Sequence, residues 1–346
     1  MACPTVTLAE SAGPASGTAL FPAAGVEPPP SPGTTSAGSV CVSSPADGST
    51  VSSPAHIQAA ASLTNAINYM RVYVDGKAEY FSWYNTIDSF LWLSPGSHSI
   101  EVLATDKSGG QASTTFTLNV SSQQASPVTQ IQTLPLWDAC SAVFPAGHPR
   151  AGQLCAAGKG TALSTMTEDQ SSPSLSGRSA KLTMGGPTGY SNELWTKYLG
   201  GGSAPTHFTY DLNFYIDRPE VAQALEFDVN QTFENTRWVF GTECNLRGDG
   251  VWDVWDGIKG WQPTSVPCKT LPANSWNHLV WTFERVGNQV HYISVQLNGT
   301  TYPLDLYYSN QPTWPFEGID VAFQMDGDFQ QDTFNVWLDN VTLNAY

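Results

Sequence analysis

The chain is 346 residues long, which suits two domains and a linker, and its 14 basic and 30 acidic residues give a net charge of −16. A surface with this charge repels phosphate backbones and anionic lipids, which argues against nucleic acid or a membrane surface as a partner. No segment approaches about 18 consecutive apolar residues, so we also expect no membrane insertion.

The first 38 residues are rich in Ala, Gly, Ser, Pro and Thr and contain few large apolar side chains. Such a segment cannot bury a core, so residues 1–38 are predicted to be a disordered tether. The N-terminus has neither the basic region nor the apolar run of a signal peptide. We therefore expect either that a signal peptide was removed or that the start of the gene is incomplete.

Residues 39–121 are predicted to form a short all-β module. Turn signals such as Asp75-Gly76 and Pro95-Gly96 separate segments of alternating hydrophobicity at 56–61, 69–74, 89–93, 97–104 and 114–120. About eighty residues with this spacing indicate a seven-strand immunoglobulin-like sandwich. The phrases SPADGSTV, MRVYVDG and LSPGSHSIEVLATDKSGG resemble the Ig-like modules of secreted bacterial proteins, and the resemblance implies a spacer or an adhesion unit.

Four aromatic residues of this module allow two interpretations. Tyr80, Trp83, Tyr84 and Trp92 either form a platform for sugar rings or fill the core, and we expect core filling for at least half of them.

After a Gln/Ser/Pro-rich linker at 122–135, residues 136–346 are predicted to be strands almost throughout. The predicted strands are 181–183, 208–216, 223–231, 237–243, 277–284, 289–297, 319–326 and 334–343. The sequence Gly200-Gly-Gly-Ser203 reads as a flexible turn. Eight or more antiparallel strands over this length are typical of a two-sheet jelly roll. The stretch WNHLVWTFE at 276–284, followed by a hairpin ending in LNG at 297–299, resembles concanavalin A-like lectin and glucanase domains.

The fold class predicted for the whole chain is therefore all-β. A disordered N-terminal segment precedes an Ig-like β-sandwich, and a larger concanavalin A-like jelly-roll β-sandwich follows.

Polar and apolar side chains alternate along several predicted strands of the C-terminal half. Glu226, Asp228 and Asn230 point to one face of their strand, opposite Leu225 and Phe227. Carboxylates on a buried sheet are costly unless they meet a ligand. The same alternation places further polar side chains on single strand faces, and if these strands are neighbours they form one concave, glycan-binding surface that includes Asp211, Asn213, Gln324 and Asp326.

The strand EFDVNQ at 226–231 resembles the E-x-D-x-x-E strand of glycoside hydrolase family 16. The resemblance implies that Glu226 is the nucleophile of a retaining hydrolase and that Asp228 assists it. Gln231 stands where the family has its acid/base residue, but its amide cannot serve as an acid. Gln231 is therefore predicted to bind the substrate instead. Glu243 is the candidate proton donor in its place, and Asp326 is the second candidate.

A Trp-rich loop at 247–261 lies between two cysteines. Trp252, Trp255 and Trp261 are predicted to stack on a glycan, with Trp255 and Trp261 the main contacts. Disulfides are predicted at Cys140–Cys155 and Cys244–Cys268, which implies an oxidising, extracellular or periplasmic setting. The pairing of Cys3 with Cys41 is left open.

The sequence thus predicts a secreted or cell-surface protein of bacterial type, and a monomer, that binds a β-linked polysaccharide. Whether it also hydrolyses the polysaccharide as an endo-β-glucanase-like enzyme is open, and the alternative is a non-catalytic, lectin-like binding or adhesion protein. We expect no cofactor and no metal ligands, because the cysteines and histidines lack metal-binding spacings. The concanavalin A-like resemblance leaves room for a structural calcium ion.

Overall fold

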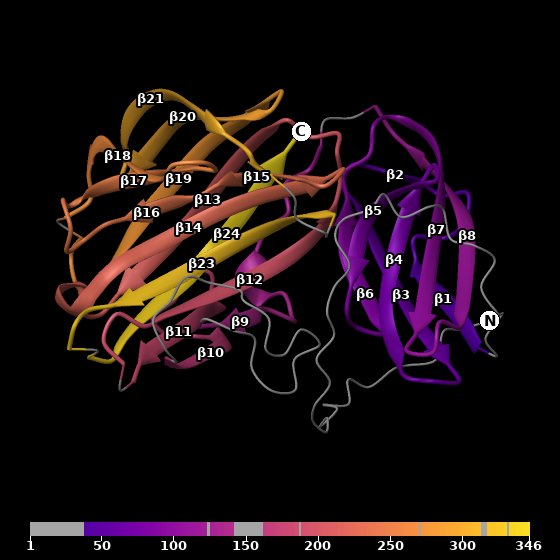
Figure 1. Cartoon of the computed structure of the whole chain (residues 1–346), viewed down its shortest axis with the longest axis horizontal. Coiled ribbons are helices and arrows are strands. Elements are labelled where there is room, and N and C mark those ends of the chain that lie inside the picture. Colours follow the sequence, from indigo (N-terminus) through magenta and orange to yellow (C-terminus); the bar gives the residue numbers. More distant parts are fainter. Residues whose placement is uncertain are drawn as a thin grey trace.

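A computed structural model describes residues 38–122, 125–141, 162–186, 188–269, 271–312, 317–330 and 332–346. The predicted tether at 1–38 lies outside these ranges except for Gly38. Over the described ranges the chain is all-β, as predicted, and its only helical segments are the 3-10 turns η1 (Ile131–Thr133) and η2 (Pro219–Val221). None of these described segments is a helix long and apolar enough to cross a membrane. Two β-sandwiches lie side by side (Figure 1).

The Ig-like module contains eight strands where the sequence predicts seven. They are β1 (Gly38–Ser44), β2 (Thr50–Val51), β3 (Ala55–Leu63), β4 (Ile67–Val74), β5 (Lys77–Ser82), β6 (Thr86–Leu91), β7 (Gly96–Asp106) and β8 (Gln111–Val120). One sheet has the order β2-β8-β7-β4-β5, and β1-β3-β6 form the other layer. The additional strand is β2, a two-residue segment that pairs with β8 in parallel. Alternating side chains such as Ile57, Val72 and Ile100 fill the core between the layers.

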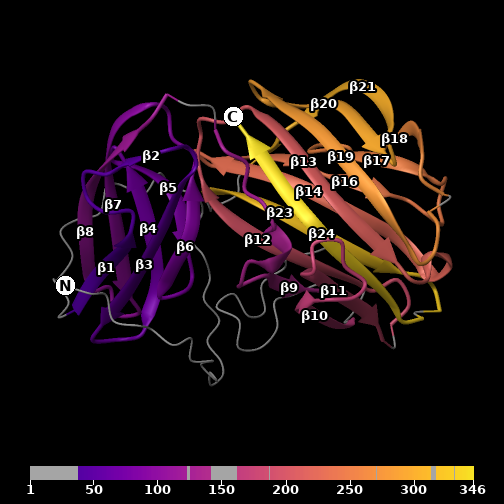
Figure 2. The ribbon, with the colours of Figure 1, turned by 180° about the vertical axis from the view of Figure 1, so that it is seen from behind.

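The C-terminal half forms the larger sandwich. Its strands are β9 (Asp138–Cys140), β10 (Leu163–Gln170), β11 (Ser179–Gly185), β12 (Asn192–Gly201), β13 (His207–Ile216), β14 (Ala222–Phe233), β15 (Thr236–Phe240), β16 (Thr242–Cys244), β17 (Val251–Asp256), β18 (Gly260–Pro267), β19 (Ser275–Val286), β20 (Gln289–Leu297), β21 (Thr300–Ser309), β22 (Gln311–Pro312), β23 (Gly318–Gly327) and β24 (Phe334–Ala345). One sheet has the order β10-β11-β24-β13-β19-β20-β21, and the facing layer contains β12-β23-β14-β16-β17-β18. Figure 2 shows the same two layers from behind.

Period-two alternation explains how the layers pack. In β13 the even-numbered side chains, from Phe208 to Ile216, are buried, while the intervening ones are only half-buried. Phe214 of β13 packs on Phe227 of β14 across the sandwich, with ring centroids 5.1 Å apart. β14 differs from β13 because nearly all its residues are buried, those on the outer face included. Its polar outer face is therefore the unusual feature of the fold.

The predicted linker contributes to this core. Ile131 and Gln132 are fully buried, and Val128 pairs with Leu343 of β24 in an isolated bridge. The 122–135 segment, where it is described, thus packs along the seven-stranded sheet.

The two modules share one sheet, because β6 pairs in parallel with the end of β12. Gly200 lies opposite Phe90 and Gly201 opposite Leu91, and the Trp92 amide donates to the Gly201 carbonyl at 2.9 Å. A Cβ on Gly201 would lie 1.7 Å from the Glu79 carbonyl oxygen, so only glycine permits this approach. The prediction of a turn is therefore wrong for Gly200 and Gly201, which lie in β12 and pair across the junction, while Gly202 and Ser203 follow the end of the strand.

Candidate functional site

A row of polar side chains crosses four neighbouring strands of the larger sandwich on its outer face. Glu226 of β14 lies directly opposite Gln324 of β23 on one side and Glu243 of β16 on the other. Glu243 in turn lies directly opposite Asp253 of β17. Directly opposed residues of antiparallel strands point to the same face with Cβ atoms about 4.5–5.5 Å apart. Three carboxyl groups therefore lie side by side across the sheet.

Further acidic side chains adjoin this row. Asp326 is two residues along β23 from Gln324, and Asp228 is two residues along β14 from Glu226, so both share the face. Asp320 lies on the same face, opposite Asn230. We call this surface the carboxylate face and define it by Glu226, Asp228, Glu243, Asp253, Asp320 and Asp326.

Hydrogen bonds link the centre of the carboxylate face. The Gln324 side-chain amide donates to Glu226 Oε1 and, at 3.2 Å, to Asp326 Oδ1. Glu226 and Asp326 also share a side-chain hydrogen bond, which raises the pKa of Glu226 and lowers that of Asp326. Asp228 Oδ1 accepts the backbone N–H of Thr242 at 2.9 Å. Glu226 and Asp228 are each only 9% exposed, so these contacts are nearly closed to water.

Burial and mutual repulsion raise the pKa values of this group. Burial, followed by the nearby Asp326, Asp228 and Glu243 charges, raises the pKa of Glu226 well above 4.5. Burial raises the pKa of Asp326 to about 6 and that of Asp228 to about 7. Burial and the Asp326 charge raise the pKa of Glu243 to about 8. The carboxylate face therefore holds both protonated and ionised carboxyl groups near neutral pH.

Two acceptor oxygens on this face have no hydrogen-bond partner. Asn230 donates from Nδ2 to Asp320 Oδ2 at 2.7 Å, but its Oδ1 is buried without a partner. Asp253 accepts from Asn245 through Oδ2 at 3.3 Å, while its Oδ1 is likewise unsatisfied. Arg237 lies 3.6 Å from Asp320 and partly balances its charge. Because buried polar groups are normally paired, the two oxygens are candidates for contacts with a ligand.

An indole pair borders the carboxylate face. Trp255 lies directly opposite Trp261, and both are on the same face as Asp253 and Glu243. Their rings meet edge to face with centroids 5.1 Å apart, and both side chains are partly exposed. Gly241 leaves room for them, since a Cβ there would lie 2.9 Å from Trp255 Cβ.

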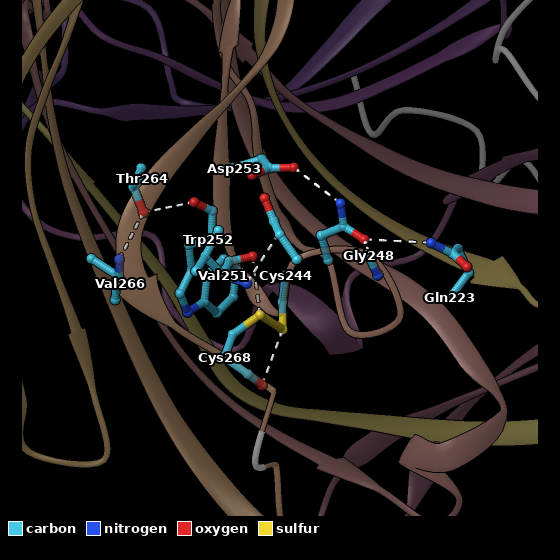
Figure 3. The surroundings of a disulfide bond; sticks show 11 residues. Gln223, Cys244, Gly248, Val251, Trp252, Asp253, Thr264, Val266 and Cys268 are labelled. Atoms are coloured by element: carbon cyan, nitrogen blue, oxygen red, sulfur yellow. Dashed lines mark hydrogen bonds between the residues drawn. A yellow bond between two sulfur atoms is a disulfide. The ribbon is translucent and has the colours of Figure 1, made fainter.

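Trp252 is not part of this border, so its predicted contact with sugar is wrong. It alternates to the inner face of β17, is 0% exposed, and packs on Trp281 with ring centroids 5.5 Å apart. The Cys244–Cys268 disulfide is confirmed, with Cα atoms 5.8 Å apart, and it fixes the ends of this region beside Trp252 (Figure 3). Cys140 and Cys41 are also disulfide-bonded. Their predicted or candidate partners Cys155 and Cys3 lie outside the described residues.

Asp211 and Asn213 do not join the carboxylate face, which corrects the expectation that their strand adjoins that of Glu226. β13 belongs to the opposite sheet, and both residues point to its outer side. There Asp211 lies 2.8 Å from His278 Nε2, and Asn213 accepts a hydrogen bond from Asn340. The alternation of polar and apolar residues correctly predicted that Asp211 and Asn213 share one face of their strand. It did not predict to which sheet that strand belongs.

Gln231 points away from the carboxylate face, so the structure contradicts its expected place beside the substrate. β14 and β23 stay in register from 224 to 232, so the odd-numbered Gln231 faces inward with Phe227 and Val229. It is 0% exposed, donates to the Gly202 and Pro205 carbonyls, and accepts from Arg285 Nε at 2.8 Å. In this regular strand the outward position four residues after Glu226 is Asn230.

Asp253 of the carboxylate face was missed as a glycan-site residue in the sequence, whereas Asp320 shares the predicted polar face of Gln324 and Asp326. Only long-range strand pairing brings Asp253 next to Glu243 and Asp320 next to Asn230. No group of three or more His, Cys, Asp or Glu side chains within the described ranges has the arrangement of a metal site.

Comparison with known proteins supports the modular architecture. Residues 39–102 match the family model of a bacterial Ig domain, which confirms the predicted resemblance over that range. No curated protein sequence matches the chain.

Solved structures match the chain at low similarity. The chain is similar to a structure from work on carbohydrate-binding modules of the β-sandwich superfamily, with 14% identity, a TM-score of 0.33 and coverage of 88% of this chain and 97% of the other. A second is the carbohydrate esterase vb_24B_21 of Shiga toxin-encoding bacteriophage phi24B, with 13% identity, a TM-score of 0.35 and coverage of 54% and 88%. A third is alginate lyase Aly36B, with 10% identity, a TM-score of 0.35 and coverage of 64% and 98%. TM-scores this low assign neither an activity nor a concanavalin A-like fold to the chain.

Proposed function

We propose that this protein is a secreted, monomeric carbohydrate-active protein of bacterial type that binds a β-linked polysaccharide on its carboxylate face. The observation that carries this proposal is the row Gln324–Glu226–Glu243–Asp253, which shares its face with the Trp255–Trp261 pair. Carboxyl and amide groups give directional hydrogen bonds to sugar hydroxyls, and indole faces cover the apolar side of a sugar ring. The net charge of −16 favours a neutral glycan over an anionic one.

The unsatisfied oxygens support the same proposal. Asn230 Oδ1 and Asp253 Oδ1 are buried acceptors on this face without partners, and sugar hydroxyls are donors of the right kind. Like-charged residues directly opposite one another destabilise a sheet, so the carboxylate row is better explained by ligand binding than by folding.

A second candidate function, retaining hydrolysis of the bound glycan, is favoured by the raised pKa values. Glu243, whose pKa is about 8, holds a proton at neutral pH and is the candidate acid that protonates the leaving glycosidic oxygen. Glu226 first passes its proton to Asp326 through the hydrogen bond that joins the two carboxyl groups, and the resulting Glu226 carboxylate attacks the anomeric carbon. Water then cleaves the glycosyl-enzyme ester, with ionised Glu243 as the base that takes the proton of the water, and Asp326 returns its proton to the released Glu226 carboxylate.

The test combines affinity electrophoresis with reducing-sugar release on β-glucan, xylan and galactan. Retardation of the wild type in gels containing one of these glycans is expected, and Glu226→Gln and Trp261→Ala should weaken it about tenfold or more. Asp211→Asn is the control, because it likewise replaces a carboxylate by its amide, but at a half-exposed position on the opposite sheet. Wild-type migration that no glycan alters would contradict the binding proposal.

Hydrolysis is decided by the second measurement. If sugar is released, Glu226→Gln and Glu243→Gln should each abolish release. With an aryl glycoside, whose leaving group needs no acid, azide should restore turnover only to Glu243→Gln, because azide attacks the glycosyl-enzyme without a base and yields a glycosyl azide. Retardation without release would leave the protein as the lectin-like alternative.

A further inference from the structure

A pocket lies where the Ig-like module meets the larger sandwich. Its volume is about 40 Å³ and its mouth is open to solvent, so a ligand bound there fills it with only part of its bulk and extends beyond the mouth. Its lining comes from both modules and includes Trp83, Tyr84, Asp88, Asp138, Tyr198 and Glu317.

The chemistry of this lining suits a sugar ring. Trp83, Tyr84 and Tyr198 supply aromatic surface, while Asp88, Asp138 and Glu317 supply hydrogen-bond acceptors. The Tyr84 hydroxyl donates to Asp138 Oδ1 at 2.9 Å, which orients one aromatic ring of the Ig-like module against a carboxylate of β9. Trp83 and Tyr84 are partly exposed, whereas Tyr80 and Trp92 are buried, in agreement with the expected division of these aromatics.

The pocket lies on the same face of the same sheet as the carboxylate face. Asp138 of β9 lies directly opposite Thr196 of β12, Thr196 opposite Ala322 of β23, and Ala322 opposite Asp228 of β14. Side chains of directly opposed residues share a face, so Asp138 and Asp228 belong to one row. They are three strand spacings apart, about 14 Å.

A second row makes the same connection. Tyr198 of β12 lies opposite Asp320 of β23, and Asp320 lies opposite Asn230 of β14. The aromatic wall of the pocket therefore continues directly into the polar groups of the carboxylate face.

The backbone conformation of one lining residue also supports a binding role for this pocket. Leu136, which contributes to its lining, has a φ of 65°, a left-handed conformation that a branched side chain rarely adopts. Such strain is concentrated at binding sites, where surrounding contacts maintain it. The sheet pairing at Gly200 and Gly201 holds the two sides of the pocket in register.

We infer that this pocket is an outer subsite for a neutral pyranose unit of the polysaccharide bound on the carboxylate face. The inference rests on the proposed function and assigns the Ig-like module a direct part in binding instead of a role as a spacer. Several sugar units are needed to span the distance from Asp228 to the pocket, so only longer oligosaccharides reach it.

A cationic ligand is disfavoured by the pocket itself. Lys197, which lies against Asp88 and Asp138, has its pKa lowered by burial to about 8 despite these carboxylates. A site that already destabilises its own buried ammonium group does not favour a second cation. His56 Nε2 and Asp88 Oδ1 are paired at 2.5 Å, so this carboxylate is also partly compensated.

The test is titration calorimetry with gluco-, xylo- and galacto-oligosaccharides of increasing length. Trp83→Ala and Tyr84→Phe are the variants, and Trp276→Ala, a partly exposed indole on the opposite sheet beside Tyr215, is the control. The longest oligosaccharide that binds should lose about tenfold in affinity with Trp83→Ala and severalfold with Tyr84→Phe, while the shortest should bind as it does to the wild type. Melting temperatures verify folding, and Tyr84→Phe is the milder change should Trp83→Ala unfold.

Each outcome separates the two proposals. If the wild type binds long oligosaccharides and neither variant changes their affinity, the outer subsite is refuted and the carboxylate-face proposal stands. Equal losses for all oligosaccharide lengths would also refute an outer subsite, because they indicate a general effect on folding. If the wild type binds no glycan, the proposed function fails and the subsite falls with it.

Discussion

Glu226 and Glu243 lie directly opposite each other on β14 and β16, with both carboxyl groups on the outer face of one sheet. Burial and mutual repulsion raise the pKa of Glu226 well above its usual range and that of Glu243 to about 8. Each proton that this pair keeps lowers the repulsion between the strands. The stability of the sandwich is consequently coupled to pH.

We predict that the protein is more stable at pH 5 than at pH 8. The folded-state pKa values of Asp326, Asp228 and Glu243, about 6, 7 and 8, exceed their ordinary values of 3.8, 3.8 and 4.5. The folded state therefore binds more protons than the unfolded state in this window, and the free energy of unfolding falls as pH rises. Thermal melting followed by circular dichroism measures the fall, at about 2–4 °C for each kcal/mol.

Glu243→Gln separates this effect from other titrating groups. His98 contributes to the same trend: burial lowers its pKa, but the hydrogen bonds with Asp75 and the Ser94 carbonyl and the Asp75 charge together raise its pKa by more. The variant removes one of the opposed carboxyl groups and leaves His98 unchanged, so its melting temperature should decline less between pH 5 and pH 8. Parallel declines in variant and wild type would show that the carboxylate face does not control this pH dependence.

Trp252→Ala should mainly reduce stability and Trp261→Ala should mainly weaken glycan binding, although the two residues are only nine positions apart in the sequence. Trp252 is fully buried against Phe227 and Trp281, so its truncation is expected to cost about 3–5 kcal/mol. Trp261 is partly exposed beside Trp255, so Trp261→Ala should reduce the unfolding free energy by about 1 kcal/mol or less and mainly weaken glycan binding. Urea unfolding and affinity electrophoresis on both variants measure the contrast. Comparable stability losses would contradict the assignment of Trp261 to the ligand face.

The local alternation of polar and apolar residues predicts which segments are strands and which face each side chain takes. It does not predict which strands lie next to one another. The faces of Glu226, Asp228 and Asn230 follow from period-two hydrophobicity, and the structure agrees. The assembly of the site depends on pairings between distant segments, such as Glu226 with Gln324, 98 residues apart. Nothing local distinguishes these pairings from the expected but incorrect proximity of Asp211.

Gln231 shows that a motif resemblance also fails to predict which side chain faces the site. A motif with two residues between Asp228 and the acid/base position reaches the outer face only if the strand bulges. β14 has no register shift there, so strand parity places Gln231 in the core and Asn230 outside. Two carboxyl groups are best placed near Glu226. They belong to Glu243 and Asp326, which lie on other strands.

Removing the Cys244–Cys268 disulfide should destabilise the border of the site. The cysteines are 24 residues apart, and closing a loop of this length stabilises a fold by about 3 kcal/mol. The double variant Cys244→Ala/Cys268→Ala should lose about that much unfolding free energy in urea. Because Glu243 adjoins Cys244, and β17 and β18 carry the indole pair between the two cysteines, glycan affinity should fall as well. Unchanged affinity at full folding would show that strand pairing alone positions the indoles.

Gly201→Ala should uncouple the two modules. A Cβ at this position would lie 1.7 Å from the Glu79 carbonyl oxygen and 2.4 Å from its carbon, and this backbone cannot yield without moving β12 away from β5, the strand of the Ig-like module that contains Glu79. Wild-type protein is expected to melt in one transition, because the sheet and the packing of Trp92 on the larger core join the modules. The variant should show two transitions in scanning calorimetry and lose affinity for long oligosaccharides while keeping that for short ones. Ser203→Ala is the control, since it removes only a side-chain hydrogen bond to Glu79 at 3.2 Å and leaves the strand pairing intact. A single transition in Gly201→Ala at the wild-type temperature would mean that the shared sheet is not what couples the modules.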